Sequence, residues 1–320
     1  MKAAVLKDLG TAPVYENYDD PHPASDDEEV MDVKAGALKN LDRLMASPDF
    51  YAHYKDLPVV VGTEAVGILS DGSRVYARGK GAFAEKMVVH KKDTVALPAE
   101  LDWSLAAAIP NAALGSYLPL KVKGEIKKGD VVLINGGTGI TGKFAIQLAK
   151  YYGASKIIVT GRVNGREEEL STVGADEFIS TEENSSLGEE IEKINKEVGV
   201  DLVLDYLWGE PAEIIIRSLS RGKGASEKPI RFINIGNVVS SNINLHCNLI
   251  RNSKLEILGS GLGSYSKNEF SDFYQNALPT IFRLAVEGEV HIDVHVQRLQ
   301  NIHSVWYQDG KGKRIVIRTG

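Results

Sequence analysis

Short runs of almost unbroken apolar residues alternate with helical patterns through the middle of the chain. A strand that is apolar on both faces is typical of a parallel sheet covered by helices on each side, whereas a half-solvated strand alternates apolar and polar residues. The pattern therefore predicts a parallel α/β domain over about 120–258. The runs lie at 131–134, 157–159, 202–204, 232–235 and 255–258.

The segments on either side of this domain have a different pattern. The first 118 residues contain short strand patterns separated by Pro, Gly and Asp, which predicts a β-rich, barrel-like domain with many turns. Beyond the α/β domain, a helix is predicted over 270–286 and strands over 290–296 and 314–318. We expect this tail to return to the first domain. The predicted domains are then 1–118 with 262–320, and 119–261.

A glycine-rich turn lies between the first apolar run and the first helical pattern of the α/β domain. It reads Gly137-x-Gly139-x-x-Gly142. The first glycine permits a tight turn, the second lets the backbone approach a pyrophosphate, and the third lets helix and strand pack closely. A G-x-G-x-x-G pattern alone is often a plain turn, but here strand, turn and helix follow in the required order. The segment predicts a Rossmann-type doubly wound sheet that binds a dinucleotide through Gly137, Thr138, Gly139, Ile140 and Thr141.

The residues after the second strand indicate which dinucleotide is bound. The ribose-selecting position lies about 20 residues past the glycines, and the chain has Arg162 there with Arg166 four residues later. A carboxylate at this position would repel a 2'-phosphate, whereas arginines offer cationic hydrogen-bond donors to it. We therefore predict NADP(H). The alternative is that Arg162 is only a solvated loop residue, or that the glutamates at 167–169 pair with the arginines.

Composition excludes several classes of protein. The chain has 320 residues, of which 43% are hydrophobic and 25% charged, with a formal net charge of -6, so we expect no nucleic-acid partner. No apolar run approaches the roughly 18 residues of a membrane span and the first residues do not resemble a signal peptide, so we expect a cytoplasmic protein. Cys247 is the only cysteine, which excludes an intrachain disulfide and a four-cysteine zinc site. The closest histidine pair, His291 and His295, fits the polar face of a half-buried strand better than a metal site.

Several segments, in order along the chain, resemble the medium-chain dehydrogenase/reductase superfamily and in particular its zinc-free quinone oxidoreductase-like branch. They include M-K-A-A-V-L at 1–6, L-P-V-V-V-G-T-E-A-V-G at 57–67, the glycine turn, and V-G-A-D-E-F-I at 173–179. The resemblance implies an α/β fold in which a β-rich, GroES-like barrel domain accompanies the Rossmann-type sheet. It also implies NAD(P)H-dependent reduction of quinones, enones or related activated double bonds, and a homodimer.

Departures from the zinc-containing relatives fall at each position where those relatives bind the catalytic metal. Lys39 stands at the position of the first zinc cysteine, Thr63 at that of the histidine before Glu64, and Asn111 at that of the third ligand. The loop that carries a second zinc is also missing after Arg78. We therefore expect no metal. Asp42 and Glu64 match family positions and are expected to organise loops.

Without a metal, the oxygen that gains negative charge during hydride transfer needs another hydrogen-bond or proton donor. In the quinone reductase relatives a tyrosine precedes the L-P-x-x-x-G-T-E segment, which makes Tyr51 and Tyr54 candidates, with His53 as an alternative donor. The alternative is that this segment is an aromatic surface loop without a catalytic role. The relatives also place an asparagine near the nicotinamide, where this chain has Lys39 beside Asn40, so either residue is a candidate contact.

Turns after later strands complete the prediction. Gly236 and Gly261 follow predicted strands at the point where turns approach the nicotinamide in this architecture, although both can equally be plain turn glycines. The sequence thus predicts an NADPH-dependent reductase of quinones or α,β-unsaturated carbonyls. Two alternatives stay open: an NADPH-binding sensor or structural protein with little turnover, and a metal-free, NADP-linked alcohol dehydrogenase.

Overall fold

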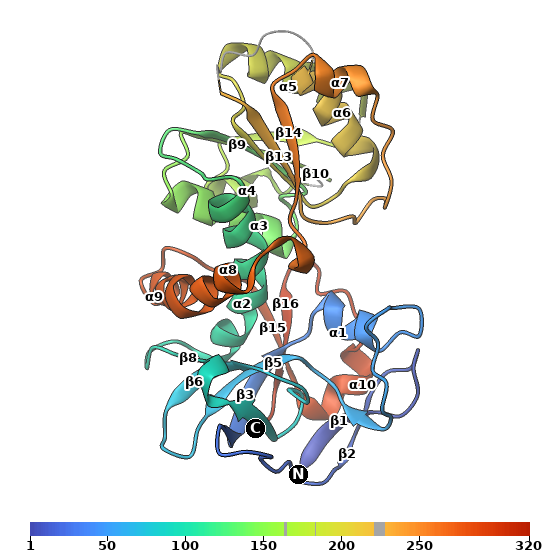
Figure 1. The fold of residues 1–320 in the computed structure, drawn as a ribbon, viewed down its shortest axis with the longest axis vertical. Helices are drawn as coiled ribbons and strands as arrows, with labels where there is room; N and C mark the ends of the chain where they lie inside the picture. Colours follow the sequence, from blue (N-terminus) through green and yellow to red (C-terminus); the bar gives the residue numbers. More distant parts are fainter. Residues whose placement is uncertain (163–164, 183, 221–227) are drawn as a thin grey trace. The chain divides into compact units, whose positions relative to one another are not determined.

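The computed structural model describes residues 1–162, 165–182, 184–220 and 228–320 (Figure 1). Contacts divide the chain into two compact units, of which unit 1 comprises 1–111 and 274–320, and unit 2 comprises 112–273. As folding units, the domains expected at 1–118 with 262–320 and at 119–261 stay a prediction. Within the described residues, none of the helices has both the length and the apolar character needed to cross a membrane.

Unit 2 is built on a parallel sheet whose six described strands lie in the order β11-β10-β9-β12-β13-β14. The first strand in sequence is thus central, and the strand order reverses between β9 and β12. This is the doubly wound order of a Rossmann-type sheet, which confirms the fold class predicted for this part of the chain. The strands are β9 (Val131–Asn135), β10 (Lys156–Gly161), β11 (Glu177–Ser180), β12 (Leu202–Asp205), β13 (Ile230–Asn234) and β14 (Leu255–Gly259).

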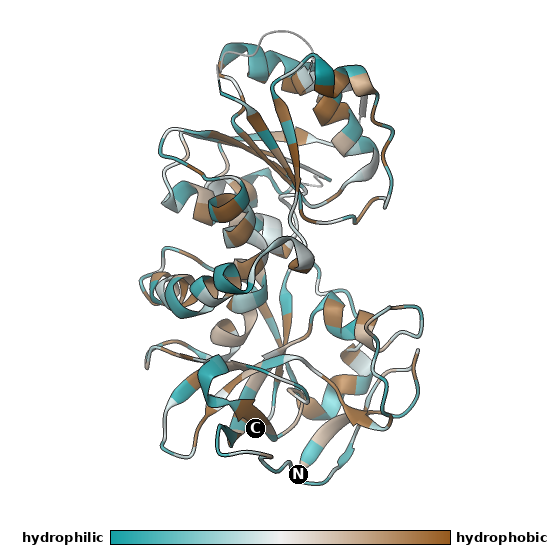
Figure 2. Ribbon diagram, in the orientation of Figure 1, coloured by the Kyte–Doolittle hydropathy of each residue, from teal (hydrophilic) through white to brown (hydrophobic). Residues whose placement is uncertain are grey.

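Helices cover the apolar strands, which appear brown in Figure 2. Leu187, Ile191 and Ile215, on the two neighbouring helices α5 and α6, pack on one face of the sheet against side chains such as Leu133 and Val203. Helix α3 contacts β9 and β10. The helices of unit 2 are α2 (Trp103–Tyr117, which begins in unit 1), α3 (Ile140–Tyr151), α4 (Glu167–Thr172), α5 (Asn184–Glu197), α6 (Gly209–Ser220), α7 (Cys247–Arg251) and α8 (Lys267–Asp272), with short turns η2 (Leu118–Lys123), η3 (Leu262–Ser264) and η4 (Phe273–Ala277, which continues into unit 1).

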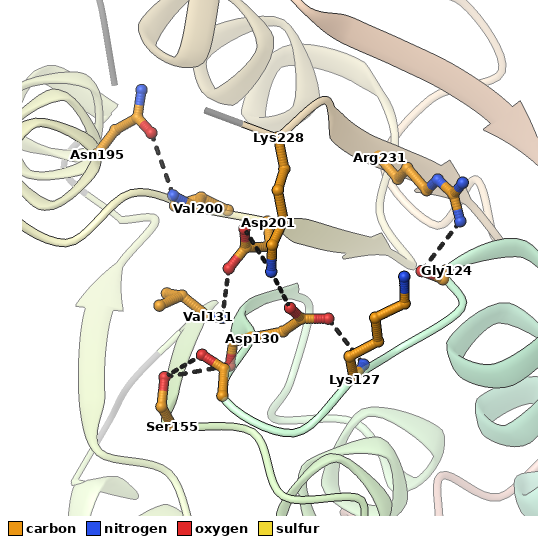
Figure 3. Close-up of polar contacts among 11 residues, drawn as sticks. Gly124, Lys127, Asp130, Val131, Ser155, Asn195, Val200, Asp201, Lys228 and Arg231 are labelled. Carbon is orange, nitrogen blue, oxygen red and sulfur yellow. Dashed lines mark hydrogen bonds and ion pairs between the residues drawn. The ribbon is translucent and has the colours of Figure 1, made fainter. Parts of the chain in front are cut away.

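The amino-terminal edge of this sheet is fixed by charged side chains (Figure 3). Asp201, which precedes β12, accepts a hydrogen bond from the backbone N–H of Val131 at 2.9 Å. The Lys228 ammonium lies 2.8 Å from Asp130 Oδ1 and 3.7 Å from Asp201 Oδ1. These contacts align the starts of β9 and β12 at the edge opposite to the glycine turn.

Unit 1 is β-rich and mostly antiparallel, which confirms the β-rich part of the predicted fold class. One described sheet has the order β2-β1-β4, and the other has the order β15-β16-β3-β5-β6-β8 with β7 paired to β3. The strands are β1 (Lys2–Leu6), β2 (Val14–Asn17), β3 (Glu28–Ala37), β4 (Val59–Val60), β5 (Glu64–Ile68), β6 (Arg74–Arg78), β7 (Lys86–His90), β8 (Thr94–Ala96), β15 (Val294–Arg298) and β16 (Arg314–Arg318). The helices are α1 (Asn40–Met45), α9 (Leu278–Val286) and α10 (Ile302–Val305), with short turns η1 (Lys91–Asp93) and η5 (Leu299–Asn301).

Two predicted elements of the tail differ from the structure. The helix expected over 270–286 is three segments, α8, the π-helical turn η4 and α9, and a proline occupies the first turn of α9. The strand expected over 290–296 begins only at Val294. His291 therefore precedes the strand, where its Nε2 lies 3.3 Å from Asp293 Oδ1, and the expected shared face with His295 was wrong.

Candidate functional site

The glycine turn of unit 2 has the geometry that a dinucleotide pyrophosphate requires. A Cβ added to Gly137 would lie 2.3 Å from Val159 Cγ1, and one added to Gly142 would lie 2.5 Å from the Gly136 carbonyl oxygen, so both positions require glycine. Around Gly139 the nearest described atom would be 3.6 Å away, which leaves its backbone open to a ligand. Helix α3 begins directly after Gly139, and no described side chain caps it. Its first amides and its dipole therefore suit an anion.

Arg166 and Arg162 lie beside this turn. The Arg166 guanidinium donates a hydrogen bond of 3.3 Å to the carbonyl oxygen of Thr138. Gly161, the last residue of β10, also approaches Thr138, because an added Cβ would lie 2.8 Å from its Cγ2. Arg162 follows and is exposed. The structure thus places Arg166 in contact with the predicted pyrophosphate turn, and it places Arg162 directly after Gly161, which approaches the same turn.

One of the acidic residues near these arginines has a different partner. Glu169 Oε1 lies 2.6 Å from the Nζ of Lys143 in α3, so this glutamate pairs with a lysine. The alternative in which the 167–169 glutamates neutralise the arginines therefore loses one of its three carboxylates.

A buried polar network that the sequence analysis missed lies at the carboxyl edge of the sheet. Thr160 donates to Asn135 Oδ1 at 2.6 Å, Asn135 donates to Asp205 Oδ1 at 2.7 Å, and Asn234 donates to Asp205 Oδ2 at 3.2 Å. Thr160, Asn135 and Asp205 have no exposed surface. The signal was present in the sequence, since β9, β12 and β13 each end their apolar run in Asn or Asp.

Asp205 is the centre of this network. Burial raises the pKa of its carboxyl, and the hydrogen bonds from Trp208 N–H, Asn135 and Asn234 oppose that shift because they stabilise the ionised form. Trp208 has a φ of 55°, in the left-handed region that few side chains adopt, and its N–H donates to Asp205 Oδ1 at 3.1 Å. The carboxylate thereby stabilises a strained turn at the end of β12.

The two predicted nicotinamide-side glycines differ in their surroundings. A Cβ on Gly236 would lie 2.6 Å from the Tyr206 carbonyl oxygen, so this turn requires glycine. Around Gly261, an added Cβ would meet no described atom within 4 Å. Gly261 is exposed, and its N–H donates to Ser264 Oγ at 2.8 Å.

Lys39 lies in a buried charge cluster in unit 1. Its Nζ is 3.2 Å from Asp42 Oδ2, 3.4 Å from Glu64 Oε1 and 3.3 Å from the Ala37 carbonyl oxygen, and its side chain is 2% exposed. Asp42 also accepts hydrogen bonds from the Lys39 N–H at 2.9 Å and from Thr63 Oγ1 at 3.1 Å. The ammonium is thus surrounded by acceptors from three segments of the chain.

A second cation belongs to the same region. Arg314 is buried, donates to Asn111 Oδ1 at 3.2 Å, and interacts electrostatically with Glu64 and Asp42. Burial lowers the pKa of its guanidinium. Tyr76 donates to Glu64 Oε2 at 2.8 Å. Two buried cations therefore balance two buried carboxylates in this cluster.

The tyrosine candidates lie in different environments. Tyr51 is 88% exposed, with its ring centroid 4.6 Å from that of Phe50. Tyr54 is buried, and its hydroxyl accepts a hydrogen bond of 3.1 Å from the Gly62 N–H. Burial raises the pKa of Tyr54, which makes it a weaker acid. Asn40, the first residue of α1, is exposed, and the ring of His53 contacts the Phe50 carbonyl oxygen at 2.8 Å.

Comparison with known proteins agrees with this architecture. The family described as zinc-binding dehydrogenase matches residues 141–281. The quinone oxidoreductase from Thermus thermophilus, also solved as a complex with NADPH, is 25% identical, with a TM-score of 0.77 and full coverage of both chains. A 2-methylene-furan-3-one reductase from Solanum lycopersicum is 32% identical over 181 residues, which cover 50% of this chain and 46% of the reductase. In sequence and in fold, the chain is similar to enzymes of the medium-chain dehydrogenase/reductase superfamily.

The resemblance inferred from the sequence is thus confirmed, and other relatives extend it. A phenolphthiocerol/phthiocerol polyketide synthase from Mycobacterium tuberculosis is 29% identical over 224 residues, which cover 67% of this chain. The match spans only 10% of that synthase, so the matching region is one part of a far longer protein there. A putative NADPH:quinone reductase from Bacillus thuringiensis has a TM-score of 0.81 over the whole chain at 20% identity, which supports the fold.

The zinc implied by the family description does not fit the residues of this chain. Among the described residues, no group of three or more His, Cys, Asp or Glu side chains is arranged to hold a metal ion. Lys39 carries an ammonium within 3.4 Å of the carboxylates that a metal would need. A divalent cation placed there would meet a buried positive charge at contact distance.

Proposed function

We propose that the chain is an NADPH-dependent reductase that transfers hydride to quinones or α,β-unsaturated carbonyls without zinc. The observation that carries the proposal is the meeting of an open glycine turn, an uncapped helix start and Arg166 at one point of unit 2. This combination supplies amides for a pyrophosphate and a guanidinium for a further phosphate.

The proposal assigns each predicted cofactor-binding residue to one portion of the dinucleotide. Backbone amides of 137–141 hold the pyrophosphate, and Arg162 and Arg166 bind the 2'-phosphate that distinguishes NADP(H) from NAD(H). Gly236, Gly261 and Asn40 are proposed contacts of the nicotinamide half. A bound nicotinamide supplies the hydride, and the protein orients it and excludes water.

The substrate oxygen gains negative charge as it accepts the hydride, so a donor to it lowers the barrier. Tyr51, Tyr54 and Lys39 are the proposed donors. Their surroundings favour Tyr51, because Tyr54 and Lys39 already contact other groups of unit 1 and are buried. Turnover of Tyr51→Phe, Tyr54→Phe and Lys39→Met with a quinone tests this assignment, since a lost donor lowers kcat about 10²–10⁴-fold.

Names of similar proteins support the substrate class. The solved neighbours include a quinone oxidoreductase and a putative NADPH:quinone reductase, and the curated relatives include a 2-methylene-furan-3-one reductase, whose name describes a conjugated ketone. Quinones and enones share an electron-poor carbon conjugated to a carbonyl oxygen. Both therefore accept a hydride and leave the charge on oxygen.

One assay separates the proposal from its alternatives. The protein is mixed with NADPH and a panel of quinones and enones, and absorbance of the reduced nicotinamide is followed. Oxidation of NADPH supports the reductase, whereas binding without oxidation supports a sensor or structural protein. Reduction of NADP⁺ by simple alcohols supports a metal-free alcohol dehydrogenase.

Cofactor choice is tested by charge reversal. Arg162→Asp should weaken NADPH binding by about 10- to 100-fold, because a charge-assisted hydrogen bond of about 1.5–3 kcal/mol becomes a repulsion, and it should leave NADH binding almost unchanged. The matched control is Arg217→Asp, an exposed arginine near the end of α6. An Arg162→Asp variant with wild-type NADPH affinity would remove the argument for NADP(H).

We also propose a cytoplasmic homodimer with a small-molecule electrophile as its partner. β14 is the outermost described strand on its side of the parallel sheet, so its outer edge is available for pairing with a second copy. Light scattering after size-exclusion chromatography gives the mass that tests the dimer.

A further inference from the structure

Three adjacent strands of unit 2 are joined at their carboxyl ends by side chains, and Asp205 is the shared acceptor. Asn135 at the end of β9 and Asn234 at the end of β13 both donate to it, at 2.7 and 3.2 Å. Thr160 in β10 supports Asn135 from the other side at 2.6 Å. The chain of hydrogen bonds therefore crosses β10, β9, β12 and β13 at a single edge.

Asp205 also fixes the backbone of the loops that follow these strands. Its Oδ1 accepts the N–H groups of Leu207 and Trp208, each at 3.1 Å. Its carbonyl oxygen accepts the N–H groups of Ile235 and Gly236, at 2.8 and 3.2 Å. One buried residue thus determines the path of the loop after β12 and of the loop after β13.

The same network reaches the glycine turn. Asn135 immediately precedes Gly136, whose N–H donates to the Thr160 carbonyl oxygen at 2.9 Å, so the start of the turn is held by the two residues that lead to Asp205. Loops at the carboxyl edge, where the strand order reverses between β9 and β12, are where doubly wound sheets bind dinucleotides. The network therefore links the loops on both sides of the reversal.

We infer that Asp205 is a positioning residue for the dinucleotide. It fixes the positions of the glycine turn and of the loops after β12 and β13 relative to one another, and so sets cofactor affinity without contacting the cofactor. This inference rests on the proposed function, because it assumes that a dinucleotide binds at this edge. A carboxylate suits the role because two oxygens accept four N–H donors, from Asn135, Leu207, Trp208 and Asn234.

Asp205→Asn tests this requirement with almost no change in shape. If the amide oxygen keeps the three donors at Oδ1, its NH₂ faces the Asn234 NH₂, which donated to Oδ2 at 3.2 Å, and two donors then oppose each other. If the amide is rotated, the three other donors lose their acceptor. Either orientation releases at least one loop.

The matched control lies at the other end of the same strand. Asp201 precedes β12, accepts the Val131 N–H at 2.9 Å and faces Lys228 at the amino edge (Figure 3). Asp201→Asn keeps an oxygen for Val131 and loses charge, so it reports what the loss of one carboxylate at the amino edge of the sheet does to stability. It does not touch the loops at the carboxyl edge.

The experiment measures the dissociation constant of NADPH by fluorescence titration, kcat at saturating NADPH, melting temperature and hydrogen exchange for the wild type and both variants. We expect Asp205→Asn to weaken NADPH binding about 10- to 100-fold, with a smaller change in kcat, and to speed amide exchange at 207 and 208. Asp201→Asn should lower the melting temperature with NADPH affinity within about threefold of the wild type. Equal affinity losses in both variants, or an Asp205→Asn variant with wild-type affinity, would overturn the inference.

A second variant keeps the test decisive if Asp205→Asn does not fold. Thr160→Val preserves the shape of the side chain and removes the hydroxyl that donates to Asn135. It should weaken NADPH binding about three- to tenfold, and unchanged affinity would contradict the role of the network. If the wild-type protein itself fails to bind NADPH, the proposed function and this inference both fail, whereas a binding wild type with insensitive variants overturns the inference alone.

Discussion

Replacing Lys39 with methionine removes the buried ammonium of unit 1 while keeping a side chain of similar length. At effective dielectric constants of about 20, the attraction of this ammonium to carboxylate oxygens 3.2 and 3.4 Å away is about 5 kcal/mol each. Loss of hydration when the ion is buried offsets several kcal/mol of this gain. The variant, however, leaves Asp42 and Glu64 buried with one cation fewer. Breaking a buried ion pair from one side costs about 3–5 kcal/mol, so we expect Lys39→Met to lose that much unfolding free energy.

Urea unfolding followed by circular dichroism measures the loss, and an exposed lysine of the same unit provides the control. Lys55→Met should stay within about 0.5 kcal/mol of the wild type, because Lys55 is exposed. The double variant Lys39→Met/Glu64→Gln should lose less than the sum of its two single variants, because each single change leaves an uncompensated charge. An unfolding free energy for Lys39→Met within about 1 kcal/mol of the wild type would refute the reasoning and leave Lys39 available as a donor to substrate.

Three further perturbations have definite outcomes. Gly137→Ala should lower the melting temperature and weaken NADPH binding, because the new methyl would lie 2.3 Å from a β10 side chain and overpacking costs about 1–3 kcal/mol. An unchanged melting temperature and an unchanged NADPH affinity would show that the turn can accommodate the methyl group. Tyr54→Phe should cost about 1–3 kcal/mol in urea unfolding, because the Gly62 N–H loses its acceptor, and a fully stable variant would contradict that role. The hydrogen bond from Lys86 lowers the pKa of the Asp20 carboxyl to about 2, so the stabilisation from this pair is complete above the ordinary value of 3.8 and is lost as pH falls through 2. An acid titration of Asp20→Asn should lack this component, and a profile identical to that of the wild type would count against it.

Sequence pattern predicted the parallel sheet because its central strands are apolar on both faces, a property each strand shows locally. The edge strand β11, Glu177–Ser180, was missed as an apolar run because only one of its four residues is fully buried. The helix expected over 270–286 keeps its apolar period across η4, so periodicity alone did not reveal the break. Edges and local changes of helix type depend on neighbours that a single segment does not encode.

The parts of the candidate site also differ in how far the sequence alone predicts them. The glycine turn is continuous in sequence, so its spacing was enough to predict it. The partners of Lys39 are not continuous: Glu64 comes from another strand, and Arg314 lies near the end of the chain. The Asp205 network could be predicted only in part. The polar residues at the ends of its strands are visible in the sequence, but the contacts between them cannot be predicted without knowing the strand order.

The ammonium at position 39 is bound covalently to the polypeptide, whereas a metal ion must be acquired after synthesis and can be lost again. Dialysis against a chelator, metal starvation of the cell, or exchange with copper or cadmium cannot remove or replace it. The positive charge that pairs with Asp42 and Glu64 is therefore present in every chain once it has been synthesised, with one ammonium per chain.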